Sequence, residues 1–515
     1  MKKRLGTILI IGSMIMSMVL GGCGGNTNVQ ETTSTSDLVT TGEVQSSTGD
    51  TGDIEKPEKI TVFVNSNVFT KVNGRDKFEE EWERITGIDM EIIQPDHDAY
   101  YDVLGQTLAS GVGNWPDVFL MNMSDVPGYS AEGVLWDMTD AWESSDLKAS
   151  GRLTSENVIE STYLDGKMYA FAHARGNGCV TYVKKAWLDN VNMEVPTNYD
   201  EYIKMLEAFT KGDPDANGID GDTYAVSSAG LILSNPPYVN YLPEFYQDAY
   251  PSFYQKADGS WADGFIEDSM KEALERLKTA YEAGYIDRES LTNGTSDVRN
   301  KFYEDKFGVF TYWAGTWGLN LKVALEANGH DGELIALPPI AEVGEYWERQ
   351  APVWGITSSA KNPEGIFKYF IENMVDGGEM QTLWTYGVED VHWSTSSGEF
   401  LMLESLERPG TYYTKHHLDP MLTIFEYIDN ADPGLAQIAK ESAASQKIFN
   451  ENSKIAPLAF STEEMIQYNG DLTTLKASIV ADIVTQGFSV EDGMARFESE
   501  GGNTWSKAIV DSLNK

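Results

Sequence analysis

Oxygen-bearing side chains alternate along residues 213–222 in a spacing that suits a hard cation. Acidic or amide side chains stand at the first, third and fifth positions, and glycine stands at the sixth. Calcium prefers about six to eight oxygen ligands wrapped around one point. The twelfth position is Tyr224, where a calcium loop of this type usually has a bidentate glutamate. The segment predicts a structural calcium site, with a metal-free turn as the alternative. The expected ligands are Asp213, Asp215, Asn217, Ile219 and Asp222, with Asp220 as the alternative to Asp222 for closing the site.

A cysteine near the N-terminus offers a second chemistry, the acylation of a thiol. Cys23 follows two glycines, a cationic head over residues 1–4 and a mainly apolar run over residues 8–20. This order is typical of a secretory signal peptide, and the run is shorter than the roughly 20 residues of a membrane-spanning helix. The end of the segment resembles a bacterial lipobox, in which the thiol receives diacylglycerol before the signal peptide is removed. We expect residues 1–22 to be a lipoprotein signal peptide and Cys23 to anchor the chain outside the cytoplasm to the cell membrane; an ordinary signal peptide with a chance cysteine is the alternative.

The only other cysteine is Cys179. If Cys23 carries lipid, no intrachain disulfide can form, and the folded body must be stabilised by burial of a core. A chain of 515 residues is long enough for that. Cys179 lies in a mixed apolar segment, which favours a buried packing residue over a nucleophile.

Charge limits the classes of partner. The chain has 80 acidic and 38 basic residues and a formal net charge of −42. Such a surface repels phosphate backbones, so nucleic-acid binding is excluded. It also disfavours binding to an anionic membrane through a basic patch.

Composition and periodicity indicate the elements that must position these residues. Residues 23–57 are rich in Thr, Ser, Gly, Asp and Glu, which predicts a disordered tether. Beyond it, β-branched and alternating runs predict strands, and apolar residues at helical spacing predict helices. The strands are expected over 59–64, 89–93, 117–121, 307–312 and 353–356. The helices are expected over 76–86, 100–110, 199–209, 268–283, 363–374 and 435–449. Strand–helix alternation with short links predicts parallel α/β sheets, and the length favours two domains.

Several short segments, in this order, resemble one known family. They are LASG and DVF at 108–111 and 117–119, YSAEGVL at 129–135, DGKMYA at 165–170, YVKKAWL at 182–188 and VPTNYDEY at 195–202. The set is similar to the extracellular solute-binding proteins of bacterial ABC importers, the family-1 type that includes maltose-binding protein. The similarity runs through nearly the whole chain after residue 58.

The resemblance implies a monomeric α/β protein with the two-lobed, type II periplasmic-binding-protein fold, each lobe a mainly parallel sheet flanked by helices. It places residues 58–175 and 357–430 in lobe one and residues 176–356 and 431–515 in lobe two. A ligand would bind in a cleft between the lobes, which close about a hinge. The partners would be a carbohydrate and the permease subunits of an ABC transporter. In the family's usual calcium loop an aspartate stands at position nine, whereas this chain has Gly221 there and Asp222 one residue later.

Aromatic side chains are candidates for contact with a sugar, because the C–H faces of sugars stack on aromatic rings. Trp313 and Trp317 follow the predicted strand at 307–312, and their segment resembles one that lines the cleft in sugar-binding relatives. Trp354 falls where the chain is expected to cross the hinge again. Packing in the core is the alternative for all three residues.

Polar candidates follow the ends of predicted strands, where open α/β sheets bind ligands. Asn65 and Asn67 follow the first strand, and Asp125 follows the third. Arg175 lies at the first expected hinge crossing and could bind a hydroxyl or carboxylate in bidentate fashion, with a structural ion pair as the alternative. Basic residues near these positions are few, which favours a neutral ligand.

The sequence contains no HExxH, CxxC, Walker-type glycine loop or GxSxG segment. We therefore predict a binding protein that performs no chemistry on its ligand. A secreted glycoside hydrolase or lyase, or a receptor for a non-sugar solute such as a peptide, is the alternative.

Overall fold

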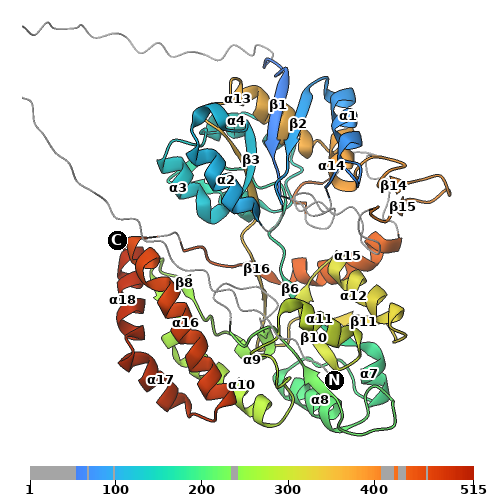
Figure 1. Cartoon of the computed structure of the whole chain (residues 1–515), viewed down its shortest axis with the longest axis vertical. Helices are drawn as coiled ribbons and strands as arrows, with labels where there is room; N and C mark the ends of the chain where they lie inside the picture. The colour runs from blue at the N-terminus through green and yellow to red at the C-terminus, as the bar shows by residue number, and fades with distance from the viewer. Residues whose placement is uncertain are drawn as a thin grey trace, which may run out of the picture. The chain divides into compact units, whose positions relative to one another are not determined.

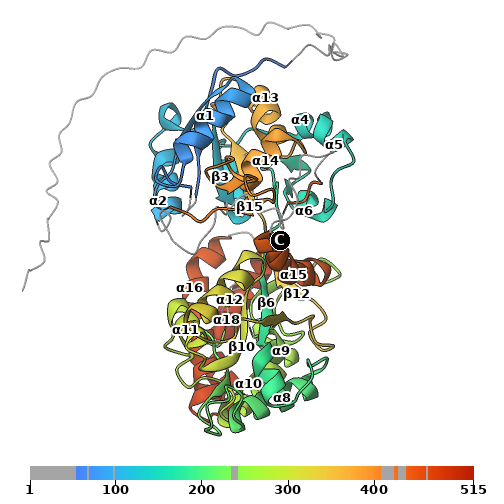
Figure 2. The ribbon, with the colours of Figure 1, turned by 90° about the vertical axis from the view of Figure 1, so that its right-hand side faces the viewer.

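The computed structural model describes residues 54–65, 69–96, 99–232, 242–406, 423–426, 437–459 and 462–515. Cys23 and Asn67, two residues singled out from the sequence, lie outside the described residues, as does most of the expected tether. The described part of the chain forms two α/β lobes (Figures 1 and 2).

The first lobe is built on a four-stranded sheet with the order β13-β3-β1-β2. β1 pairs in parallel with both β2 and β3, whereas β13 runs antiparallel to β3. The strands are β1 (Lys59–Phe63), β2 (Asp89–Ile93), β3 (Val118–Asn122) and β13 (Pro352–Ile356). The parallel pairs confirm the crossovers predicted from the alternation of strands and helices.

Helix α1 (Arg75–Thr86) shows how the sequence positions the helices of this lobe. Phe78 and Trp82 lie one turn apart and are both buried. The helix ends at Gly87, whose φ of 66° lies in the left-handed region that glycine favours. The lobe also contains α2 (Tyr100–Ala109), α3 (Val126–Ala131), α4 (Thr139–Glu143), α5 (Asp146–Ala149), α6 (Glu156–Glu160), α13 (Pro363–Ile366), a π-helical segment η5 (Phe367–Glu372) and α14 (Glu379–Tyr386).

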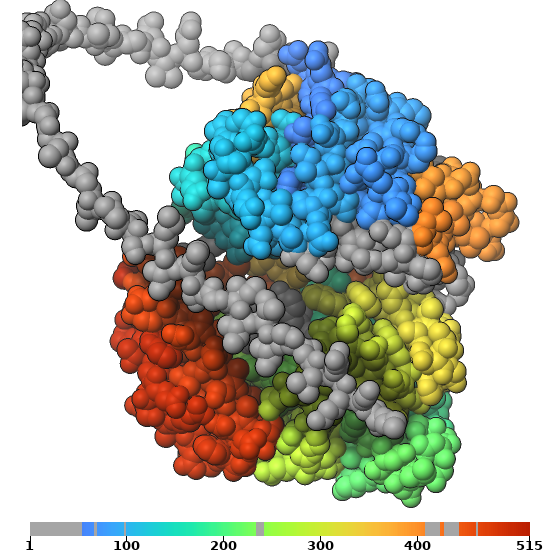
Figure 3. All heavy atoms as spheres, viewed as in Figure 1, coloured from blue at the N-terminus to red at the C-terminus, as the bar shows by residue number. Residues whose placement is uncertain are grey.

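Two short hairpins complete the first lobe. They are β4 (Tyr163–Leu164) with β5 (Lys167–Met168), and β14 (Trp393–Ser394) with β15 (Leu401–Met402). The β14–β15 hairpin, drawn in orange, projects from the surface in Figures 1 and 3.

The second lobe is built on a sheet with the order β11-β6-β10-β7. Only β10 and β7 pair in parallel, because β6 is antiparallel to both of its neighbours. This differs from the mainly parallel arrangement that we expected. The register shows the difference directly. Cys179 at the start of β6 pairs with Trp313 at the end of β10, so these two strands run in opposite directions. The strands are β6 (Cys179–Lys184), β7 (Tyr224–Val226), β10 (Phe307–Trp313) and β11 (Leu334–Ala336).

Three helices of the second lobe lie over the amphipathic segments predicted at 199–209, 268–283 and 435–449. In α8 the Asn198 side chain caps the N-terminus by accepting a hydrogen bond from the Glu201 N–H at 3.0 Å. The helices are α7 (Lys185–Asn190), α8 (Tyr199–Lys211), α9 (Pro243–Tyr246), α10 (Asp268–Glu282), α11 (Thr295–Tyr303), α12 (Thr316–Ala327), α15 (Gln437–Glu451), α16 (Glu463–Thr485), α17 (Val490–Ser499) and α18 (Gly502–Leu513). Two further strand pairs are β8 (Phe253–Gln255) with β9 (Trp261–Asp263), and β12 (Tyr346–Glu348) with β16 (Ser453–Ile455).

The chain passes between the lobes more than once, and the crossing segments lie side by side. Gly178 forms a β-bridge with Glu348, and Phe171 forms one with Trp354. Gly176 fits here only because it lacks a side chain, since a Cβ would lie 1.8 Å from the carbonyl oxygen of Arg349. Strand β13 pairs with β3, so residues 352–356, which we assigned to lobe two, lie in the sheet of lobe one. The other lobe boundaries stay predictions.

Candidate ligand-binding site

The ends of several strands converge near the crossing segments. Pro352, at the start of β13, pairs with Asn122 at the end of β3, and β1 lies next to β3 in the sheet. In the second lobe, Trp313 at the end of β10 pairs with Cys179, just after the first crossing. The residues that follow β1, β3 and β10 therefore lie at the edges of the two sheets that the crossings join.

In the first lobe, Tyr101 brings the predicted polar residues together. Its hydroxyl donates to Asn122 Oδ1 at 3.0 Å. Burial raises the pKa of Tyr101, and the negative charge of Asp125 adds to that rise. The rise is opposed by hydrogen bonds with Asn65 and Asn122 and by the positive charge of Arg349. The Tyr101 hydroxyl, at the first turn of α2, thus has Asn65 and Asn122 as hydrogen-bond partners and is affected by the charge of Asp125.

Asp125 is the acidic group of this set. Its Oδ2 accepts a hydrogen bond from the Asn122 N–H at 3.3 Å. Burial raises the pKa of Asp125, although hydrogen bonds with Asn122 and Ser124 act in the opposite direction. Asp125 can therefore accept hydrogen bonds from a ligand while its hydrogen bond with Asn122 keeps its loop attached to the end of β3.

In the second lobe, two half-buried tryptophans follow one another at the end of β10. Trp313 is the last residue of the strand and Trp317 lies in the first turn of α12. The Arg349 guanidinium lies over the Trp313 ring at 5.1 Å from its centroid, and the Arg299 guanidinium lies over the Trp317 ring at 5.3 Å. Each indole therefore has a cation–π partner.

Arg349 links the two sets of side chains. Its guanidinium contacts the Trp313 ring of lobe two and is close enough to the Tyr101 hydroxyl of lobe one to affect the pKa of that phenol. Its Nε donates to the carbonyl of Gly176 on the neighbouring crossing segment. We define the strand-end site by Asn65, Tyr101, Asn122, Asp125, Arg299, Trp313, Trp317 and Arg349.

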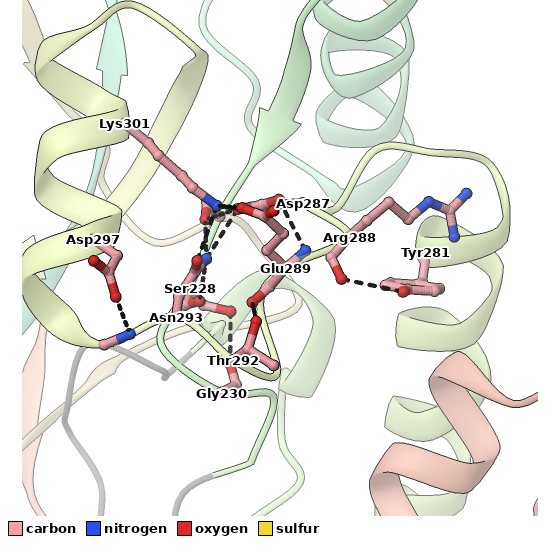
Figure 4. Close-up of polar contacts among 12 residues, drawn as sticks. Ser228, Gly230, Tyr281, Asp287, Arg288, Glu289, Thr292, Asn293, Asp297 and Lys301 are labelled. Carbon is pink, nitrogen blue, oxygen red and sulfur yellow. Dashed lines mark hydrogen bonds and ion pairs between the residues drawn. The ribbon is translucent and has the colours of Figure 1, made fainter. Parts of the chain in front are cut away.

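A partly buried polar network holds α11, the helix that carries Arg299. Lys301 donates to Asp287 Oδ2 at 2.8 Å, to Glu289 Oε2 at 2.5 Å and to Asn293 Oδ1 at 2.9 Å (Figure 4). Burial would raise the pKa of Asp287, but the hydrogen bonds from Lys301, the Glu289 N–H, Asn293 and Ser227 hold it below its ordinary value. Arg299, two residues before Lys301, then donates to the Tyr312 hydroxyl at 2.9 Å.

Two other residues predicted to contact ligand have side chains that instead contact other residues of the protein. Arg175 donates through Nε to both oxygens of Glu348, at 3.1 and 3.0 Å, and Glu348 is 1% exposed. This is the structural ion pair that we considered as the alternative for Arg175. Trp354 is 0% exposed and packs edge-on against Phe370 at 5.2 Å, so it is a core residue of lobe one.

The predicted calcium ligands lie together in one loop. Asp213 accepts hydrogen bonds from the Asn217 and Gly218 N–H groups, both at 2.9 Å. The Asn217 side-chain amide donates to Asp215 Oδ2 at 2.8 Å and to Asp222 Oδ2 at 2.9 Å, and its Oδ1 accepts from the Ile219 N–H at 2.8 Å. In the described part of the chain, no three His, Cys, Asp or Glu side chains are arranged to hold a metal ion.

The chemistry of this loop nevertheless suits a cation. Asp215 Oδ1 is buried and has no hydrogen-bond partner among the described residues. The pKa of Asp215 is raised by burial, by the Asp213 side chain and by the charge of Asp222. A divalent ion would satisfy the unpaired oxygen and relieve the repulsion between the carboxylates.

Residues 75–370 match the family model described as "Bacterial extracellular solute-binding protein". That stretch is more than half of the chain. The chain belongs to this family. Proteins of this extracellular family are receptors and not enzymes, which agrees with the absence of a catalytic motif in the sequence. None of the described helices combines the length and the apolar character needed to span a bilayer.

Curated relatives of this solute-binding protein are distant in sequence. The polygalacturonan/rhamnogalacturonan-binding protein YtcQ of Bacillus subtilis is 22% identical over 62% of this chain, and the match spans 64% of the length of YtcQ. The lipoprotein LipO of Bacillus subtilis is 22% identical over 84% of this chain and 87% of its own length.

Solved structures of extracellular solute-binding proteins share the fold. One from Bifidobacterium longum subsp. infantis has a TM-score of 0.66 at 19% identity, over 90% of this chain and 100% of its own. An EF-hand mutant of the Streptococcus pneumoniae protein FusA, in complex with fructo-nystose, has a TM-score of 0.58 at 17% identity, over 88% of this chain and 98% of its own. These similarities confirm the predicted two-lobed α/β fold.

Four members of the strand-end site were not predicted from the sequence: Tyr101, Asn122, Arg299 and Arg349. Tyr101 follows the buried Tyr100 at the start of a helix, where the helical periodicity indicates a packing role for both residues. Arg299 lies within α11, far from any strand end in sequence. Arg349 offered one weak signal, since it lies three positions before Pro352, the first residue of the strand that re-enters lobe one.

Proposed function

We propose that this solute-binding protein captures an oligosaccharide at the strand-end site and delivers it to an ABC permease. The observation that carries the proposal is the pair of half-buried indoles, Trp313 and Trp317, which Arg349 relates to the amide and hydroxyl groups around Tyr101. Indole faces offer the stacking surface that the C–H faces of sugars need. Asn65, Tyr101 and Asp125 offer donors and acceptors for hydroxyl groups.

The names of the relatives support a saccharide ligand. YtcQ is named for binding polygalacturonan and rhamnogalacturonan, and the FusA structure holds a fructo-oligosaccharide. Each of those ligands is an oligomer or polymer of sugars. Contacts from both lobes would favour the closed state, because a ligand shifts a two-state equilibrium only by binding one state more tightly.

Titration calorimetry against a panel of oligosaccharides tests the proposal. We expect saturable heat with at least one saccharide and an unchanged ligand when the mixture is analysed by chromatography. Trp313→Ala and Trp317→Ala should each weaken binding by about tenfold or more, since a buried aromatic contact contributes about 1.5–3 kcal/mol.

A matched control is Trp261→Ala, which removes a half-buried tryptophan from the β8–β9 hairpin. This variant should bind as the parent does. Normal binding by both strand-end variants would exclude these indoles from the binding site.

We also propose that Cys23 carries diacylglycerol and that residues 23–57 tether the receptor to the outer face of the cell membrane. The lipobox-like order of residues 20–23 supports this anchor, and the relative LipO is a lipoprotein by name. Labelling of cells with an alkynyl fatty acid should mark the parent and leave Cys23→Ser unmarked. Equal labelling of both proteins would rule out Cys23 as the lipid attachment site.

We infer that the loop of residues 213–222 binds calcium in a structural role. Asp213, Asp215 and Asp222 would supply carboxylate oxygens, and the Asn217 side chain and the Ile219 backbone would complete the set. The unpaired Oδ1 of Asp215 supports this inference, as does the EF-hand named for the FusA structure. Calcium would neutralise the repelling carboxylates and stabilise the loop.

Chelator should lower the midpoint of thermal unfolding of the parent but not that of Asp215→Asn/Asp222→Asn. Because the loop lies in lobe two and shares no residue with the strand-end site, saccharide affinity should change little. A parent melt that does not respond to chelator would exclude an occupied site.

A further inference from the structure

Two arginines bring positive charge to the strand-end site, which the sequence predicted to be poor in basic groups. Arg299 and Arg349 lie over Trp317 and Trp313 at 5.3 and 5.1 Å. Both guanidinium groups are half-buried. The chain carries 80 acidic and 38 basic residues, so a guanidinium group over each of the two candidate indoles is informative.

Arg299 differs from the arginines whose charge is neutralised within the protein. Arg175 pairs with Glu348, and Arg496 pairs with Asp482 and Glu500. The hydrogen bonds described for the Arg299 guanidinium go to neutral hydroxyl groups, Tyr312 Oη and Ser296 Oγ, each at 2.9 Å. Among the described residues, Arg299 forms no ion pair with a carboxylate within 4.0 Å. Its charge is therefore available to an anionic group of a ligand.

Arg349 extends this charge toward the first lobe. Its Nε is used by the carbonyl of Gly176, which holds the side chain against the crossing segment. The guanidinium is near enough to the Tyr101 hydroxyl to oppose the rise in its pKa, so its field reaches the polar residues of lobe one. Arginine binds planar carboxylates in bidentate fashion, and stacking on an indole holds the guanidinium plane in place for such a contact.

We propose that the strand-end site takes an oligosaccharide that carries carboxylate groups, such as an oligomer of uronic acids. This inference rests on the proposed function and specifies its ligand class. The indoles would stack on the sugar rings, and Arg299 and Arg349 would each bind a carboxylate on neighbouring residues of the oligomer.

The test compares each acidic trimer with its carboxyl-reduced, neutral counterpart. The probes are trimers of galacturonate, of mannuronate and of glucuronate, and the measurement is titration calorimetry with the full folded chain. We expect at least one acidic trimer to bind about tenfold or more tightly than its reduced form, in line with charge-assisted bidentate contacts. This preference should weaken as salt rises from about 0.02 to about 0.5 M, because salt screens partly exposed charges.

Variants assign the preference to the two arginines. Arg299→Gln and Arg349→Gln should each reduce affinity for the acidic trimer by about tenfold and reduce affinity for its carboxyl-reduced form by clearly less, so that the preference for the acidic trimer falls. Arg349→Lys keeps the charge beside the Gly176 carbonyl, so it should retain part of the preference even if the glutamine variant folds poorly. The matched control is Arg288→Gln, which removes an arginine stacked on Tyr281 at 4.3 Å, outside the strand-end site.

The outcomes separate this inference from the proposed function. Equal or tighter binding of the reduced trimers overturns the acidic ligand class and leaves an oligosaccharide receptor in place. An acidic preference that Arg299→Gln and Arg349→Gln both retain also overturns the assignment. If no saccharide of either kind binds, both the ligand class and the proposed function are wrong.

Discussion

The two lobes share a plan of helices on a four-stranded sheet, but their interiors are stabilised by different interactions. The centre of lobe one is aromatic: Trp384 packs against Phe78 at 4.9 Å, Phe370 at 5.5 Å and Trp82 at 6.2 Å, mostly edge to face. Such contacts involve no titratable group. Their stability should therefore depend little on pH.

Lobe two buries ionisable groups inside its core. Lys476 of α16 donates to Asp263 Oδ1 at 2.7 Å, and Lys184 of β6 donates to Asp305 Oδ1 at 2.5 Å. Glu244 of α9 is 1% exposed and accepts a hydrogen bond from Thr181 at 2.6 Å. Burial lowers the pKa of Lys184 to about 8 and raises that of Glu244 to about 7. Two lobes with a similar plan thus have different interiors, one with buried charged groups and the other with packed aromatic rings. The stability of the two lobes should therefore respond differently to pH.

The largest effect is expected in the aromatic lobe. Trp354→Ala should lower the free energy of unfolding by about 4 kcal/mol, because it leaves a large cavity among packed rings. Denaturant titration at pH 6 and pH 8 should give the same loss at both values. A variant that keeps full stability but loses saccharide binding would instead make Trp354 a ligand contact.

The charged lobe should respond almost as strongly to the loss of one partner of a buried pair. Lys476→Met leaves Asp263 charged and buried, which should cost about 3 kcal/mol. The double variant Lys476→Met/Asp263→Leu removes both charges and should recover most of that loss. If the double variant is no more stable than Lys476→Met, the destabilisation comes from packing around α16 and not from the unpaired charge.

Glu244 should make the stability of lobe two depend on pH. Its folded pKa of about 7 lies above the ordinary value of 4.5, so the folded state binds more protons than the unfolded state between those values. Stability from this group is therefore present at low pH and falls as the pH rises from about 4.5 to about 7. Glu244→Gln should stabilise the protein by about 2–3 kcal/mol at pH 8 and change little at pH 5. Equal stability of parent and variant at pH 8 would place the pKa of Glu244 near its ordinary value.

Asp287 should show the opposite and smaller dependence. Its pKa is lowered, so its contribution is present above the unfolded value of about 3.9 and is lost as the pH falls through the folded pKa. Asp287→Asn weakens the network around Lys301 and should cost about 1–2 kcal/mol at pH 7. The difference between parent and variant, measured by denaturant titration, should shrink between pH 5 and pH 3. A difference that does not depend on pH would assign the loss to hydrogen-bond geometry alone.

Local patterns predicted much of the fold. Helix α8 (Tyr199–Lys211) follows from apolar spacing and the Asn198 cap, and β1 follows from its β-branched run. Two sets of residues were placed differently by tertiary contacts. Pro352–Ile356 reads as a strand in sequence, but its pairing with β3 decides that it belongs to lobe one. Trp354 and Arg175 read as ligand contacts, but packing against Phe370 and pairing with Glu348 use those side chains inside the protein.

The sequence by itself determined the expected signal peptide, the alternation of strands and helices, the acidic loop of residues 213–222 and membership in a family of extracellular receptors. These properties depend on neighbours along the chain, and short-range patterns specify them. Only the tertiary structure decided that Tyr101, Arg299 and Arg349 join Trp313 and Trp317 at the strand-end site. The physical reason is that this site is assembled by strand ends and crossing segments that lie far apart in sequence, up to the 284 positions between Asn65 and Arg349, and only the pairing of the sheets brings them together.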